Sequence, residues 1–151
     1  MITSEILDKF HEWTKKQDFP HCYPDNFKVI DFLLENPELK AIKGFSRIFR
    51  GLPKTGDYVE IPCDIFNFTD DFYYQYERYF YKVIRGREWR ERCRRWRSQF
   101  GKEWKQQYRE GFTDGYYFSG EWRPMLVSPR SDTPYDYAYV QGRNSIVSER
   151  R

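Results

Sequence analysis

The expected fold class depends on one stretch near the C-terminus, residues 116–140, which reads YYFSGEWRPMLVSPRSDTPYDYAYV. Residues 116–127 predict a β-hairpin, because strand-forming aromatic and aliphatic residues flank a turn at Ser119-Gly120. Pro124 would place the second strand of this hairpin at an edge of the sheet. The tyrosines at 135, 137 and 139 alternate with other residues, which is the period of a strand. The stretch therefore predicts a small antiparallel sheet.

The residues that precede this stretch have mainly helical patterns. In the first segment, Ile2, Ile6, Phe10 and Trp13 recur at helical spacing, and Thr3 or Ser4 can cap the helix. The expected helices cover about residues 5–16, 27–35, 37–50, 69–84 and 87–109. Between the third and the fourth, Tyr58–Ile61 reads as a strand that Pro62 stops. The sequence thus predicts an α+β fold of about five helices followed by a C-terminal sheet of three or four strands.

Local signals predict the ends of the helices. Thr69 followed by two acids is typical of a helix start. Gly86 is expected to stop that helix, Gly101 to weaken the next one, and Gly111 and Gly115 to end it. Residues 1–142 are predicted to form a single globular domain, with 143–151 as a flexible tail.

Composition limits the classes of protein that the chain can belong to. Its 151 residues are typical of one domain, and no apolar run is long enough for a membrane span. The N-terminal residues lack the pattern of a secretory signal, and the three cysteines are odd in number and far apart. We therefore expect a cytoplasmic protein in a reducing compartment. Aromatic residues make up 21% of the chain, so the core must be built largely from rings.

The most informative segment for function covers residues 85–110 and reads RGREWRERCRRWRSQFGKEWKQQYRE. On a helix, Trp89, Cys93, Trp96, Phe100 and Trp104 form one stripe, which we expect to be buried. Basic residues occupy the opposite side: Arg87, Arg90, Arg94, Arg97 and Lys105, with Lys102 and Arg109 near its border. Pairs of Glu88 with Arg92 and of Glu91 with Arg95 would neutralise part of the charge.

The basic face has two interpretations. The planar guanidinium group of arginine donates two parallel hydrogen bonds to phosphate. Protein grooves that bind nucleic acid combine such donors with aromatic rings on which bases stack. Tyr74 and Tyr81 lie two turns apart on the far side of the preceding helix and are candidates for an exposed stacking ladder. Alternatively, the basic face is only solvated, and the predicted hairpin covers the two tyrosines.

No pattern in the chain favours catalysis. A glycine-rich phosphate loop, a histidine–carboxylate metal pattern and a nucleophile elbow are all missing from the sequence. Asp57, Glu60 and Asp64 could bind a metal, but no lysine accompanies them as in nuclease sites. We predict no catalytic residue and no cofactor and assign no metal site, while metal binding by the acidic segment 57–77 stays open.

These patterns favour a non-catalytic binding protein whose first-choice partner is a nucleic acid or another phosphate-rich ligand. The alternative is an inhibitor or adaptor that binds a protein, because Trp, Tyr and Arg also dominate protein–protein hot spots. The size and composition are typical of accessory proteins of viruses or mobile elements. The oligomeric state stays open.

Overall fold

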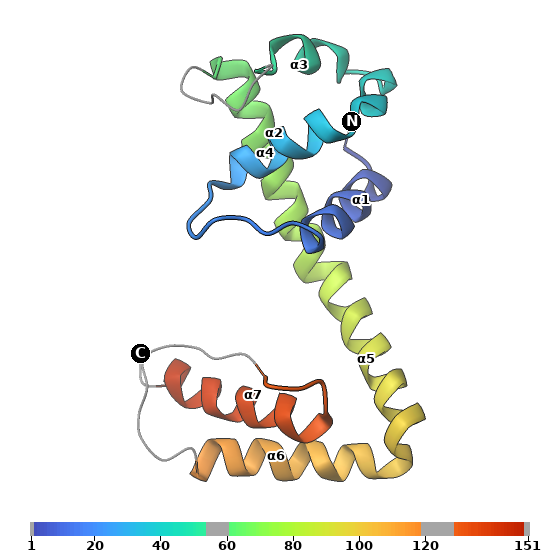
Figure 1. The fold of residues 1–151 in the computed structure, drawn as a ribbon, viewed down its shortest axis with the longest axis vertical. Helices are drawn as coiled ribbons and strands as arrows, with labels where there is room; N and C mark the ends of the chain where they lie inside the picture. The colour runs from blue at the N-terminus through green and yellow to red at the C-terminus, as the bar shows by residue number, and fades with distance from the viewer. Residues whose placement is uncertain (1, 54–60, 119–128, 150–151) are drawn as a thin grey trace. The chain divides into compact units, whose positions relative to one another are not determined.

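The computed structural model describes residues 2–53, 61–118 and 129–149, and every element in these ranges is helical (Figure 1). The chain divides into two compact units, Met1–Gly86 and Arg87–Arg151. The predicted α+β fold is wrong, because the described residues contain no strand.

Within the described ranges, no helix combines the length and the apolar character needed to cross a membrane.

The first unit is built from helices that follow the predicted pattern near the N-terminus. Its elements are α1 (Ser4–Lys15), α2 (Asp25–Glu35), the 3₁₀ helix η1 (Pro37–Ala41), α3 (Ser46–Gly51), α4 (Cys63–Tyr79) and the π-helix η2 (Phe80–Ile84). The predicted cap is confirmed, since the Thr3 hydroxyl accepts from the Ile6 amide at 3.4 Å. The third predicted helix is instead divided between η1 and α3, because Ile42 has an extended backbone.

The core of this unit combines rings with aliphatic side chains, so the prediction of a core built largely from rings is only partly right. Phe10 of α1 is fully buried, with Phe32 of α2 and Phe72 of α4 at centroid distances of 5.1 and 5.2 Å. The polar ends of the surrounding rings have partners. The Tyr76 hydroxyl lies 2.8 Å from Nδ1 of His11, so the core closes around hydrogen-bonded rings rather than around aliphatic side chains alone.

The boundaries of α4 differ from the prediction. The helix begins after Pro62, and Thr69 is buried inside it, where its hydroxyl donates to the Phe66 carbonyl at 2.9 Å. Thr69 therefore satisfies its hydroxyl within the helix instead of capping it. The predicted helix end at Gly86 is also wrong, since this residue lies inside α5 (Arg85–Phe100). Glycine in a helix interior costs only about 1 kcal/mol, which packing can offset.

The second unit contains α5 from Arg87 onward, the 3₁₀ helix η3 (Gly101–Glu103), α6 (Trp104–Phe118) and α7 (Pro134–Glu149). The predicted weak point at Gly101 is confirmed as a break, because this residue has a φ of 61°. Few residues other than glycine adopt that backbone angle. The chain turns at this position, and α6 and α7 then lie side by side (Figure 1).

The contact between α6 and α7 is close enough to require glycine. A Cβ atom on Gly111 would overlap with the carbonyl oxygen of Tyr135, and one on Gly115 with that of Tyr139. Gly142 of α7 has the same relation to the Phe112 carbonyl. The prediction that Gly111 and Gly115 end a helix is therefore wrong. Both lie inside α6, where they let its backbone approach that of α7.

Two of the predicted strands are helical. Tyr116–Phe118 belongs to α6, and the tyrosines at 135, 137 and 139 belong to α7. The Thr133 hydroxyl caps α7 by accepting from the Asp136 amide at 3.2 Å, and Pro134 takes the first helical position. These signals for a helix start outweigh the alternation of tyrosines that predicted a strand. The predicted strand at 121–127, and Tyr58–Ile61 except for its last residue, lie outside the described residues. The helix α7 continues to Glu149, through positions expected to form a tail.

Candidate functional site

The tryptophan stripe of α5 holds this helix within the second unit. Trp96 has an exposed fraction of 0%, as expected for a structural residue. Its ring lies 5.9 Å from those of Trp89 and Trp104 and 5.6 Å from that of Tyr137. Its indole nitrogen donates to the Asp132 carbonyl at 3.0 Å. The prediction that Trp96 is structural is confirmed, but the expected stripe is not buried throughout, since Trp89 is 37% exposed, and Trp104 belongs to α6.

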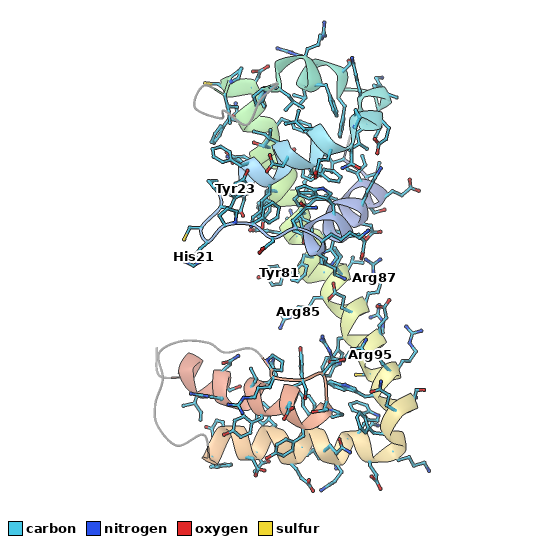
Figure 2. The ribbon with its side chains drawn as sticks, in the orientation of Figure 1. His21, Tyr23, Tyr81, Arg85, Arg87 and Arg95 are labelled. Carbon is cyan, nitrogen blue, oxygen red and sulfur yellow. The ribbon has the colours of Figure 1, made fainter. Side chains whose placement is uncertain are left out.

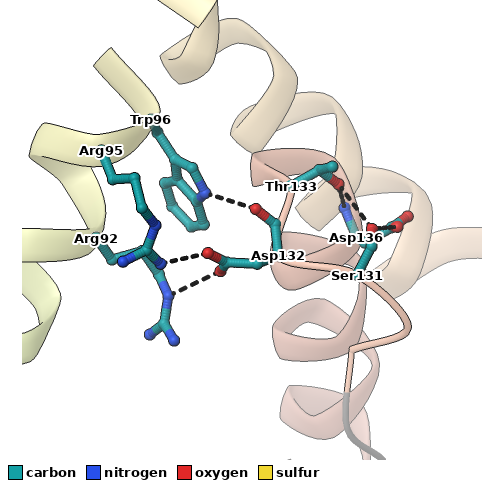
Figure 3. Close-up of polar contacts among 7 residues, drawn as sticks. All are labelled: Arg92, Arg95, Trp96, Ser131, Asp132, Thr133 and Asp136. Atoms are coloured by element: carbon teal, nitrogen blue, oxygen red, sulfur yellow. Dashed lines mark hydrogen bonds and ion pairs between the residues drawn. The ribbon is translucent and has the colours of Figure 1, made fainter. Parts of the chain in front are cut away.

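Asp132 also binds two of the arginines of α5 (Figure 3). Its carboxylate lies 3.2 Å from Nε of Arg92 and pairs with the guanidinium of Arg95. The Arg92 guanidinium also stands 4.5 Å from the centre of the Tyr137 ring. These contacts join α5 to the residues before α7, so Arg92 and Arg95 have a structural role.

A second group of arginines on α5 is exposed. Arg90, Arg94 and Arg97 recur at three- and four-residue spacing, which places them on one side of the helix. Among the described residues, none of the three has a carboxylate partner. Arg87 lies on the same side but is half-buried and engaged in other interactions. We call Arg90, Arg94 and Arg97 the arginine face.

The remaining predicted cations do not continue this face. Because the helix breaks at Gly101, Lys102 lies in η3, whereas Lys105 and Arg109 lie on α6. All three are exposed, and Nζ of Lys105 stands 5.9 Å from the Trp104 ring. The expectation of one continuous basic helix is therefore wrong, and the cations are divided between two helices of the same unit.

The two predicted ladder tyrosines lie in the first unit and are exposed. Their exposed fractions are 58% for Tyr74 and 66% for Tyr81. The expected covering hairpin is not formed, as its first strand is part of α6. Arg78 lies 5.7 Å from the Tyr74 ring and Arg85 lies 6.0 Å from the Tyr81 ring. Figure 2 shows Tyr81 and Arg85 projecting from the same side of the helix.

The arginines next to these tyrosines were missed by the sequence reasoning. Each follows its tyrosine by four residues, which is one helical turn, so the spacing contained the signal. A shallow groove of about 310 Å³ lies beside Tyr74, and Arg78, Lys82 and Val83 are among the residues that line it. The exposed surface of α4 and η2 thus combines rings, cations and a groove.

Burial shifts the pKa of two titratable groups of the second unit. Burial raises the pKa of the Cys93 thiol, although Arg97 and Arg92 oppose this effect. Burial also raises the pKa of Tyr108. In the part of the chain that the structure describes, no three His, Cys, Asp or Glu side chains gather as metal ligands. Of the acids considered for a metal, Asp57 and Glu60 lie outside the described residues. Asp64 is exposed, with Oδ2 3.9 Å from Nε of Arg47.

Comparison with known proteins identifies no relative of this chain. It has no significant match to a protein-family model, to a curated protein or to a solved structure. Its function can therefore be inferred only from its own side chains, of which the exposed arginines and tyrosines are the most informative.

Proposed function

We propose that the chain is a non-catalytic binding protein that engages nucleic acid through the arginine face of α5. One observation carries this proposal: the arginines of a single helix divide into two groups with different surroundings. Arg92 and Arg95 pair with Asp132 where α5 meets the residues before α7. The arginine face is exposed, and no carboxylate among the described residues pairs with it. Its charge is thus not required for packing.

The chemistry of arginine fits a phosphate backbone. A guanidinium group donates two parallel hydrogen bonds to phosphate and stays charged at any physiological pH. Three such groups on successive turns of a rigid helix present a row of donors. The exposed side chains of Lys102, Lys105 and Arg109 add positive charge to the same unit. Contacts of this kind release counterions, so binding must weaken as salt rises.

The test is the triple variant Arg90→Glu, Arg94→Glu and Arg97→Glu. We expect it to lose affinity for a labelled 12-nucleotide RNA in a fluorescence anisotropy titration at low salt. Each lost phosphate contact should lower the slope of log affinity against log salt by about 0.7 for a single strand. The melting temperature should stay close to that of the parent, because these side chains are exposed.

A matched control separates a local site from net charge. Lys16, Lys40 and Arg50 are exposed cations of the first unit, and their reversal to Glu changes the net charge equally, from +3 to +3 − 6 = −3. We expect the control triple variant to keep most of the affinity. Equal losses in both variants, or no loss in the first, would contradict the proposal. A protein partner that stays bound after nuclease treatment and moderate salt would favour the adaptor alternative.

A further inference from the structure

We infer that the exposed tyrosines of α4 and η2 stack on unpaired bases, so that the preferred ligand is single-stranded nucleic acid. This inference rests on the proposed function and names its substrate class. It concerns four residues of the first unit, Tyr74, Arg78, Tyr81 and Arg85, which we call the tyrosine–arginine stripe. They form two ring–cation pairs, in which Arg78 lies 5.7 Å from the Tyr74 ring and Arg85 lies 6.0 Å from the Tyr81 ring.

The exposure of the two rings sets them apart from the other tyrosines that the structure describes in this unit. Tyr23, Tyr76 and Tyr79 are half-buried and have hydrogen bonds to Asp31, His11 and Asp8. In the described residues, the hydroxyls of Tyr74 and Tyr81 have no such partner. Many rings of this unit pack in or against its core, yet these two remain at the surface. Exposed rings on a helix next to cations are typical of a stacking platform for bases.

The geometry of the stripe fits a nucleic-acid strand. At a rise of about 1.5 Å per residue, Tyr74 and Tyr81 are roughly 10 Å apart along the helix. Stacked nucleotides repeat at about 3.4 Å, so the rings can hold bases about three nucleotides apart. Arg78 and Arg85 lie one turn after each ring, and their guanidinium groups can donate to the phosphates between those bases.

The groove beside Tyr74 supports a base as its occupant. Its volume of about 310 Å³ is at the lower end of the range for small-ligand sites. Leu7 and Val83 supply apolar surface. Asp71 also lines the groove, and its carboxylate accepts from the Gln75 amide at 2.8 Å. A carboxylate repels phosphate but accepts hydrogen bonds from the N–H groups of unpaired bases, including N3–H of thymine, so the groove suits a base.

The π-helix within the stripe is a second indication. Tyr81 and Lys82 belong to η2, whose wider turns interrupt the α-helical hydrogen bonding between α4 and α5. Such π-segments are rare and occur frequently at functional sites. In this segment, the side chains of Tyr81 and Lys82 are exposed, while that of Ile84 is fully buried. The π-segment therefore combines a buried Ile84 with an exposed Tyr81.

The experiment compares two 12-nucleotide probes, oligothymidylate and an abasic strand that has the same phosphates but no bases. The double variant Tyr74→Ala and Tyr81→Ala should lose affinity for oligothymidylate by about 30-fold or more, since each stacked base contributes roughly 5- to 150-fold. Its affinity for the abasic strand should match that of the parent. The variant Tyr74→Phe and Tyr81→Phe keeps both rings and should restore binding to oligothymidylate.

Tyr117 provides the control, because it has an exposed fraction of 70% on α6 of the other unit. Tyr117→Ala should bind both probes as the parent does. Unchanged oligothymidylate binding by the double alanine variant, or an equal loss on both probes, overturns the inference but leaves the proposed function standing. Failure of the parent to bind either probe at low salt overturns both. A double variant that keeps the probes but loses a nuclease-resistant protein partner assigns the stripe to protein binding and overturns the inference.

Discussion

At the scale of single residues, a hydrogen bond between α6 and α7 makes stability depend on pH. The Tyr135 hydroxyl donates to Asp114 at 2.6 Å, and this bond raises the pKa of Tyr135 from 10.0 to about 12. The folded state therefore favours the neutral phenol more than the unfolded chain does. We expect its contribution to be complete below pH 10 and lost as pH rises towards 12. Urea unfolding of the parent and of Tyr135→Phe should show this loss only in the parent. A parallel decline in both proteins would assign it to other groups.

Single-residue roles could be predicted where they follow from local spacing. Trp96 was identified as buried because its stripe repeats at helical intervals, and the same reasoning singled out Tyr74 and Tyr81. The partner of Arg92 and Arg95 could not be found in this way. Asp132 lies 40 and 37 residues away along the chain, and the local pairs with Glu88 and Glu91 seemed sufficient. Local spacing identifies a helix face but cannot identify a distant partner.

At the scale of elements, the pairing of α6 with α7 depends on the absence of side chains at the contact. Gly115→Ala would place a methyl group against the Tyr139 carbonyl, which belongs to a backbone and cannot rotate away. We expect a loss of about 1–3 kcal/mol in the free energy of unfolding, as for other overpacked sites. Thr113→Ala, at an exposed position of the same helix, is the control and should be nearly neutral. Denaturant unfolding measures the free energy of unfolding of both variants. An unchanged value for Gly115→Ala would show that the two helices can separate without cost.

The fold class was wrong because one sequence pattern fits two structures. Alternating tyrosines at 135, 137 and 139 satisfy the period of a strand, but two of them are also one helical turn apart, with rings 6.3 Å from each other. The deciding signal was Thr133-Pro134, a cap followed by a favoured first residue. Glycines four residues apart likewise fit either a helix end or a close helix contact. Only the three-dimensional pairing separates these alternatives.

At the scale of the whole molecule, the two compact units predict two unfolding events. The core of the first unit is centred on Phe10 and that of the second on Trp96, and both side chains have an exposed fraction of 0%. Phe10→Ala and Trp96→Ala should each lower the stability of their own unit by about 3–5 kcal/mol. Hydrogen exchange read by mass spectrometry should show faster exchange in α1–α4 for the first variant and in α6–α7 for the second. Faster exchange throughout the chain in either variant would show one cooperative unit instead.

The contact between Trp96 and Asp132 has a consequence for how fast the second unit can form. Helices α5, α6 and α7 are local structures that can form within about a microsecond, whereas this contact joins residues 36 apart. The chain must close a loop of that length before the Trp96 indole, Arg92 and Arg95 contact Asp132. The conformational entropy of loop closure is therefore lost before these contacts stabilise the unit. The docking of α7 against α5, rather than helix formation, should therefore set the refolding rate of this unit.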